Sequence, residues 1–244
     1  MTSMRTAILS LLLSPGLVFA TGHFDFETGM AANTYNEVQI SQSTGTRFSI
    51  SDDLDVASMA FWRARLSWSI SADRRVEILA APLEFKASGS APAEILFDGR
   101  RFEAGTPLQA TYRFDSYRIS YLQSIRDSEA LSLELGFTAK LRDAEIAISS
   151  SGLSASKDNR GFVPLLAFRM AWRMNPSWAL RIEADALAAP QGRAEDVLLA
   201  LEHRLGDRLD LRGGYRFVEG GADVEDVYNF AFIHYASLGL RVRI

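Results

Sequence analysis

Strict alternation of apolar and polar residues recurs from end to end of this chain. Across Trp178–Asp185 the even positions are apolar, whereas Arg181, Glu183 and Asp185 occupy odd positions. The last nine residues, 236–244, repeat the pattern. Successive side chains of a β-strand point to opposite faces, so each such segment predicts a strand with one apolar and one polar face.

Ten segments carry this pattern, and most have ten or more residues, whereas strands of globular domains usually have about 5–6. The predicted strands are Gly22–Ala32, Met59–Ser71, Arg75–Phe85, Gln109–Ile125, Ala130–Ile146, Phe162–Met174, Trp178–Leu187, Ala194–Leu205, Arg208–Val218 and Asn229–Ile244.

The connections between these segments alternate in length. Four are tight polar turns, SADRR, IRDSEA, MNPSW and LGDRL. The intervening links are longer, at Ala32–Ser58, Lys86–Leu108, Ala147–Gly161 and Glu219–Tyr228, with AAPQGR as the short exception. Short turns at one end and long loops at the other are typical of an outer-membrane barrel. A soluble β-sandwich, the alternative fold, has no reason to sort its loops in this way.

The segment Ala194–Leu205, AEDVLLALEHRL, is ambiguous. Val197, Leu198, Leu201 and Leu205 form a helical stripe in residues that favour helices. The alternation of Val197, Leu199 and Leu201 with charged positions indicates a strand instead. We predict a strand, because a helix would leave an odd strand count.

The first twenty residues predict a secretory signal peptide. Arg5 precedes an apolar run at residues 7–13, and small residues occupy the −3 and −1 positions of a cleavage site after Ala20. The alternative, a membrane anchor helix, conflicts with the break at Pro15-Gly16. We therefore expect residues 1–20 to be the signal peptide and residues 21–244 the barrel domain. No later apolar run approaches the ~20 residues of a spanning helix.

Composition excludes several classes of site. The chain has no Cys, so no disulfide, zinc-thiolate or thiol nucleophile is available, and three His leave little room for a histidine-built metal site. The net charge is −4 and no long Lys/Arg block occurs, so nucleic acid is not an expected partner.

The parity of the strands assigns side chains to two environments. Spanning strands must close into a barrel, so the apolar faces meet lipid and the charged faces line the lumen. The expected lipid-facing aromatic residues are Trp62, Trp68, Phe137, Trp172, Trp178, Tyr215 and Phe232. The expected lumen residues are Arg63, Arg65, Glu77, Glu134, Lys140, Arg142, Arg169, Arg181, Glu183, Asp185, Glu202, Arg204, Asp210, Arg212, Arg216 and Arg241. Ten strands enclose little space, so we expect a network of paired charges to fill most of the lumen.

Two groupings could suggest catalysis. His234 and Ser237 lie three residues apart, as a histidine–serine pair of a lipid deacylase would require if they met. In a strand, however, that spacing places them on opposite faces. Glu183 and Asp185 share a face about 7 Å apart and could form an acid–base dyad, but Arg181 beside them favours neutralisation. We predict no catalytic residues from either grouping.

The remaining candidates are expected to be structural. His203 is predicted near the membrane interface and His23 at the start of the barrel. The acidic segment 220–228 could suggest calcium through Asp223, Glu225 and Asp226, but its spacing matches no known motif. It and segment 151–161 are expected to be solvated loops. We predict no metal site and no cofactor site.

Several segments carry a family resemblance. They are FDGRRFEAGTP, YRFDSYRISY, SKDNRGFVPLLAF, ALAAPQGRAEDV and EGGADVEDVYNFAFIHYA. The chain resembles an uncharacterised group of Gram-negative outer-membrane β-barrel proteins over most of residues 21–244. The resemblance implies a barrel and no activity. Outer-membrane proteins often end in an aromatic residue that the assembly machinery recognises, whereas this chain ends in Ile244.

The predicted fold class is all-β, an antiparallel up-and-down transmembrane barrel of about ten strands, with eight or twelve as alternatives. We expect a non-enzymatic monomer of the outer membrane with both termini in the periplasm. Its surface loops would serve interaction or envelope integrity. Its partners would be outer-membrane lipids, lipopolysaccharide and the assembly machinery. A lipid-modifying enzyme and a narrow channel or transporter are the alternatives.

Overall fold

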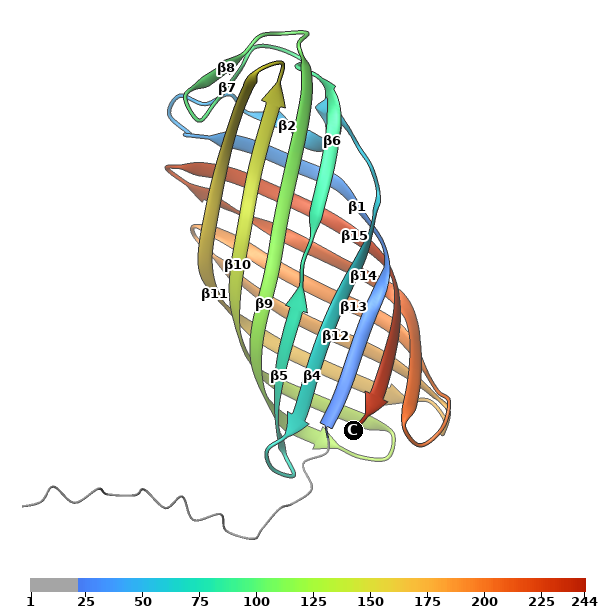
Figure 1. Cartoon of the computed structure of the whole chain (residues 1–244). Helices are drawn as coiled ribbons and strands as arrows, with labels where there is room; N and C mark the ends of the chain where they lie inside the picture. Colours follow the sequence, from blue (N-terminus) through green and yellow to red (C-terminus); the bar gives the residue numbers. More distant parts are fainter. Residues whose placement is uncertain (1–21) are drawn as a thin grey trace, which may run out of the picture.

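A computed structural model describes residues 22–244 as a closed antiparallel barrel of ten strands (Figure 1). Each of the ten predicted segments forms a wall strand. The wall strands are β1 (Gly22–Ile40), β4 (Met59–Ser69), β5 (Arg74–Ala81), β9 (Pro107–Asp127), β10 (Leu131–Ser150), β11 (Leu153–Arg173), β12 (Trp178–Ala189), β13 (Gly192–Arg204), β14 (Leu209–Val224) and β15 (Val227–Arg243).

The ring is complete because the first and last strands pair. Phe26 of β1 lies opposite Leu240 of β15, and β5 and β10 both pair with β9. Closure pairs each strand with two neighbours, and in a bilayer it satisfies backbone groups that would otherwise meet lipid. At the far end, residues 153–165 of β11 extend beyond β12 and, within the described chain, pair with β10 alone. The expected signal peptide, residues 1–20, lies outside the described residues.

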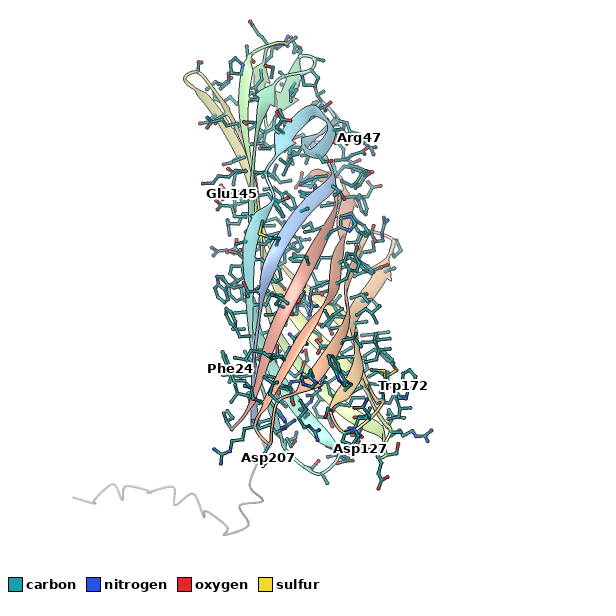
Figure 2. All side chains as sticks on the ribbon, turned by 90° about the vertical axis from the view of Figure 1, so that its right-hand side faces the viewer. Phe24, Arg47, Asp127, Glu145, Trp172 and Asp207 are labelled. Atoms are coloured by element: carbon teal, nitrogen blue, oxygen red, sulfur yellow. The ribbon has the colours of Figure 1, made fainter. Side chains whose placement is uncertain are left out.

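The two ends of the barrel differ, as predicted. One end, called here the terminal end, holds Gly22 and the chain's last residues together with four tight turns (Figure 1). The opposite end is called the far end. Asp127 and Asp207 lie at the terminal end, whereas Arg47 and Glu145 lie toward the far end (Figure 2).

The far-end loops correct the prediction from sequence. Segment 151–161 was expected to be a solvated loop, but it continues the wall as part of β11 after a turn at Ser151-Gly152. Segment 220–228 likewise lies mostly in β14 and β15, around a turn at Glu225-Asp226. Both hairpins extend because their residues keep pairing with neighbouring strands. At these two places the added length lies in strands rather than loops.

The other two far-end links fold into and over the lumen. They contain β2 (Phe48–Ser49), α1 (Ile50–Asp53), β3 (Leu54–Val56), β6 (Glu84–Ser90), β7 (Ile95–Phe97) and β8 (Arg100–Phe102). Pro82 separates β6 from β5, so the predicted strand Arg75–Phe85 is interrupted, although β6 continues to pair with β9. Phe48, Phe85, Phe97 and Phe102 belong to one buried apolar cluster. We call this cluster and its loops the plug.

Segment 194–205 is a strand, as predicted. Residues 192–204 form β13, and this strand pairs with β12 on one side and with β14 on the other. Buried Asp196 and Leu198 face the lumen, whereas exposed Leu199 and Leu201 face outward. The described part of the chain contains no helix that is long and apolar enough to cross a membrane.

The outer wall carries an apolar belt. Phe137, Trp62 and Trp178 are exposed by 68%, 46% and 42%, and Trp172, Trp178 and His203 lie toward the terminal end, where turns 174–177 and 205–208 follow. Trp68 and Phe232 are partly buried on the same face. The expected lipid-facing parity is confirmed for these aromatic residues. A belt of this kind suits contact with lipid acyl chains.

Candidate functional site in the lumen

A layer of charged side chains fills the terminal half of the lumen and is called the charge layer. Its carboxylates are Asp25, Glu27, Glu77, Glu183, Asp185, Asp196 and Glu202, and its cations are Arg63, Arg65, Arg118, Arg169, Arg181, Arg212, Arg216 and Arg241. All are buried except Glu202 and Arg241, which are partly buried. They converge because parity turns every charged strand face inward.

Asp196 lies where three strands meet across the lumen. Its carboxylate oxygens lie 2.8 Å from Arg63 and 2.6 Å from Arg118, and it also pairs with Arg216. Arg216 lies on the neighbouring strand β14, whereas Arg63 on β4 and Arg118 on β9 reach Asp196 from other parts of the wall. Buried ions are stable only when paired in this way.

Glu183 and Asp185 do not form an acid–base dyad. Glu183 accepts a hydrogen bond from Arg65 at 2.7 Å, whereas Asp185 accepts hydrogen bonds from Arg118 and Arg169, each at 2.8 Å. Different arginines therefore neutralise the two carboxylates. This is the neutralisation that the neighbouring charges predict.

Two further groups complete the charge layer. Glu27 accepts hydrogen bonds from Arg216, both at 2.8 Å, and from Ser237 at 2.8 Å. Nearer the terminal end, Arg181 forms a two-pronged pair with Glu202, with hydrogen bonds of 2.9 and 2.8 Å. Two parallel N–H···O bonds fix the relative orientation of the two groups as well as joining them.

Parity identified most of this layer but not all of it. Asp25, Glu27, Arg118 and Asp196 were absent from the predicted lumen set. Asp25 and Arg118 each lie between two apolar residues and could have been found by the same rule, whereas Glu27 and Asp196 each have one polar neighbour. Arg204 was expected in the lumen, but its side chain is 51% exposed at the terminal end. Arg204 is the last residue of β13, so its side chain extends from the end of the wall into solvent.

The far half of the lumen is apolar, which corrects the expectation of a lumen filled by charge. Phe61 and Tyr235 stack edge to face with centroids 4.8 Å apart, directly above the charge layer. Both rings belong to the same buried apolar cluster as the phenylalanines of the plug. Between the two regions lies a cavity of about 10 Å³, lined in part by Arg63, Arg118 and Tyr235. A space of that size accommodates about one water molecule.

A larger cavity of about 560 Å³ opens at the terminal end. Trp178, Glu202, Arg204 and Asp210 contribute to its lining. It lies below the Arg181–Glu202 pair, so the charge layer forms its inner boundary. The mixture of acidic and basic side chains gives it no single charge preference.

His234 and Ser237 lie on opposite faces, as parity predicts. His234 faces outward and its Nδ1 lies 2.5 Å from the hydroxyl of Tyr215. Ser237 is buried in the lumen and donates to Glu27. The two side chains therefore do not meet as a nucleophile–base pair, which requires about 2.6–3.2 Å.

The remaining predicted positions have structural surroundings. His203 stacks against Trp178 with ring centroids 4.4 Å apart, and His23 lies opposite Arg243 in the first wall pair. Asp223 accepts a hydrogen bond from Gln42 at 2.6 Å. Within residues 22–244, no group of three or more His, Asp or Glu side chains is arranged to hold a metal ion.

Comparisons with known proteins describe the fold. No protein-family model matches the chain, and no curated protein matches its sequence. The structure is similar to the outer membrane protease OmpT from Escherichia coli, with a TM-score of 0.61 and 6% identity over 92% of this chain and 97% of that chain. It is also similar to the transport unit of the autotransporter AIDA-I from Escherichia coli, with a TM-score of 0.50 and 9% identity over 95% of this chain and 93% of that chain. Similarity at such low identity extends to architecture and not to activity.

Proposed function

Because the chain has the fold of Gram-negative outer-membrane β-barrel proteins, we propose that it is a non-conducting, non-enzymatic barrel of the outer membrane. Both termini lie in the periplasm in this proposal, and the far end lies outside the cell. The far end provides a surface for interaction or envelope integrity. The observation that carries the proposal is that two different regions fill the lumen in succession, the charge layer in its terminal half and the apolar plug in its far half.

The charge layer opposes conduction at the first level. An ion crossing it would have to separate pairs such as Arg65–Glu183 at 2.7 Å and Arg118–Asp196 at 2.6 Å. Separating a buried pair leaves charges without a partner in a region of low dielectric constant, which costs several kcal/mol per pair. Porins that conduct freely use about 16–18 strands and keep an aqueous centre.

The plug opposes conduction at the second level. Phe97 and Phe102 of the β7–β8 hairpin are 0% and 1% exposed, and Phe85 below them is 1% exposed. Backbone hydrogen bonds hold this region in place, including Thr46 N to Leu96 O at 2.9 Å. An apolar constriction excludes hydrated ions because nothing in it replaces their hydration shell.

Three tall strands support a role for the far end as a surface. β9, β10 and β11 have 21, 20 and 21 residues, about twice the 9–11 residues that span a bilayer. On their outer face, exposed Tyr117, Leu141 and Phe162 give way to the ion-paired Arg113 and Asp143. We infer that this change marks the membrane boundary and that the strands continue above it.

The proposed partners follow from these surfaces. The apolar belt contacts outer-membrane lipids, and the ion-paired Arg113 and Asp143 above it lie at the height of lipopolysaccharide head groups. The assembly machinery inserts the barrel. Around the ring, every wall strand is paired with two neighbours, and residues 153–165 of β11, which lack a partner on one side in the described chain, lie at the far end. Within the apolar belt this leaves little strand edge for a second copy, which favours a monomer.

Conductance tests the closed lumen. We expect the purified full chain, reconstituted in planar bilayers, to produce no conductance steps, whereas a porin inserted by the same procedure produces them. Insertion is checked independently by protease protection of the reconstituted protein. Reproducible steps from correctly inserted protein would establish a narrow channel and overturn the proposal.

Cysteine labelling tests the orientation. The natural chain has no Cys, so a single introduced thiol is the only reactive one. Ser154→Cys, at the exposed far end, should react with a membrane-impermeant maleimide on intact cells. Asp207→Cys, in an exposed turn at the terminal end (Figure 2), should react only after the outer membrane is permeabilised. The reverse pattern would contradict the proposed orientation.

A further inference from the structure

Two lumen cations differ from all members of the charge layer. Each arginine of that layer lies within 4.0 Å of at least one carboxylate. Lys140 and Arg142 have no carboxylate within that distance in residues 22–244, although both point inward from β10. The layer itself has eight arginines and seven carboxylates, so it has no negative excess that could neutralise them.

Lys140 is the more deeply placed of the two. Its side chain belongs to a residue that is 3% exposed. Its ammonium group lies 4.5 Å from the ring centroid of Phe114. A cation–π contact stabilises a desolvated cation by less than the penalty for burying an isolated ammonium ion.

Arg142 lies beside it, two residues along the same strand face. One of its terminal nitrogens donates to the side-chain oxygen of Asn159, and its Nε has no hydrogen-bond partner in the structure. Gly161 makes room for the guanidinium group, because a Cβ at that position would lie 3.1 Å from Nη2.

The pair lies next to an open edge of the wall. β11 pairs with β12 from Leu166 to Arg173, and no strand of the described chain pairs with residues 153–165 on that side. Lys140 and Arg142 lie opposite Val163 and Gly161, within this unpaired stretch. Arg142 is partly exposed there, whereas Lys140 is buried, so a solute arriving from the far end meets the Arg142 guanidinium group first.

We propose that Lys140 and Arg142 form a binding site for a phosphate group, with Ser116 and Asn159 as neutral partners. Ser116 lies opposite Arg142 on β9, and its Oγ accepts a hydrogen bond from Arg118 at 2.9 Å. Its hydroxyl hydrogen is therefore available to a ligand oxygen. The planar guanidinium group matches two phosphate oxygens, and the ammonium group supplies a second charge. The phosphate belongs either to a soluble ion or to a glycolipid head group.

Calorimetry on the full chain in detergent micelles tests the site with two probes, inorganic phosphate and a phosphorylated glucosamine lipid in the same detergent. Saturable binding of inorganic phosphate would identify a soluble ligand, and binding of the lipid alone would identify a head group. Lys140→Met and Arg142→Gln should each weaken binding about tenfold or more, because each removes a charged hydrogen-bond donor. Absence of binding of both probes to the natural chain would overturn the proposal.

A matched control separates the site from general electrostatic attraction. Lys86 is also a far-end lysine, but its side chain is 77% exposed and pairs with Glu84. Lys86→Met should leave the affinity unchanged. Equal weakening by Lys86→Met and Lys140→Met would contradict a specific site.

A second measurement addresses folding of the variants. In phosphate-free buffer, Lys140→Met should unfold at no lower urea concentration than the natural chain, because the substitution removes an unpaired buried charge. At the same phosphate concentration, added phosphate should raise the unfolding midpoint of the natural chain more than that of Lys140→Met. An equal rise in both proteins would overturn the assignment.

Discussion

At the scale of single residues, the parity of a position along its strand decides whether a charged side chain faces the lumen. The oppositely charged side chains around it then determine whether it is stable when buried. Asp196 illustrates both effects. Its place in β13 turns it inward, and Arg63, Arg118 and Arg216 then meet it from three other strands. The alternation in the sequence identifies the inward face, but it does not identify these partners, which lie up to 133 residues away.

Asp196→Asn should destabilise the barrel by about 3–5 kcal/mol, because it leaves three buried guanidinium groups without their shared anion. The change is measured by urea unfolding from lipid vesicles. Asp127→Asn is the control, since the Asp127 side chain is 67% exposed and its contact with Arg173 is 3.5 Å. That control should change stability by less than about 0.5 kcal/mol. Similar results for both variants would contradict the role assigned to the charge layer.

The outward face makes a separate prediction. Leu238 on β15 is 65% exposed on the apolar belt. Leu238→Arg should lower stability in vesicles by about 2–4 kcal/mol if it lies near the bilayer midplane. Ser154→Arg, which introduces the same charge at the far end, should have little effect. A neutral result for Leu238→Arg would contradict a place for this residue near the bilayer midplane.

At the scale of elements, periodicity predicted each wall strand but underestimated several at the far end. β10 and β11 extend to Ser150 and from Leu153 because they pair with each other to the turn. Residues 157–160, Lys-Asp-Asn-Arg, are polar at every position and lack the apolar alternation that signals a strand with one face on lipid. Their strand structure depends on backbone pairing with a neighbour, and this pairing has no signature in composition.

The plug should loosen independently of the wall. Phe97 is completely buried and stacks edge to face with Phe48 at 6.4 Å. Phe97→Ala should cost about 3–5 kcal/mol of local stability and speed amide exchange in residues 91–106. Exchange in β12 and β13 should stay slow, because their hydrogen bonds lie within the ring. Arg101→Ala, at a side chain that is 66% exposed, is the control. Uniform acceleration across all strands would indicate that plug and wall unfold together.

At the scale of the whole molecule, closure determines how the protein behaves outside a membrane. The ring of ten strands buries its charges and exposes its apolar side chains, the reverse of a soluble domain. We expect the purified protein in detergent to show mainly β circular dichroism. It should also migrate differently on gels before and after boiling. If a protein of residues 22–244 stayed monodisperse in buffer without detergent, that result would contradict an outer wall that contacts lipid.

The sequence alone determined the strands, the inward and outward faces and the arrangement of tight turns at one end, because these depend on a two-residue period and on local turn chemistry. The tertiary structure alone decided which charges meet across the lumen. It also decided that the plug residues, including Phe97 and Phe102, enter the far half, and that Lys140 and Arg142 remain without a carboxylate. The physical reason is that a period is a property of neighbouring residues, whereas contacts across a closed barrel depend on its register and curvature.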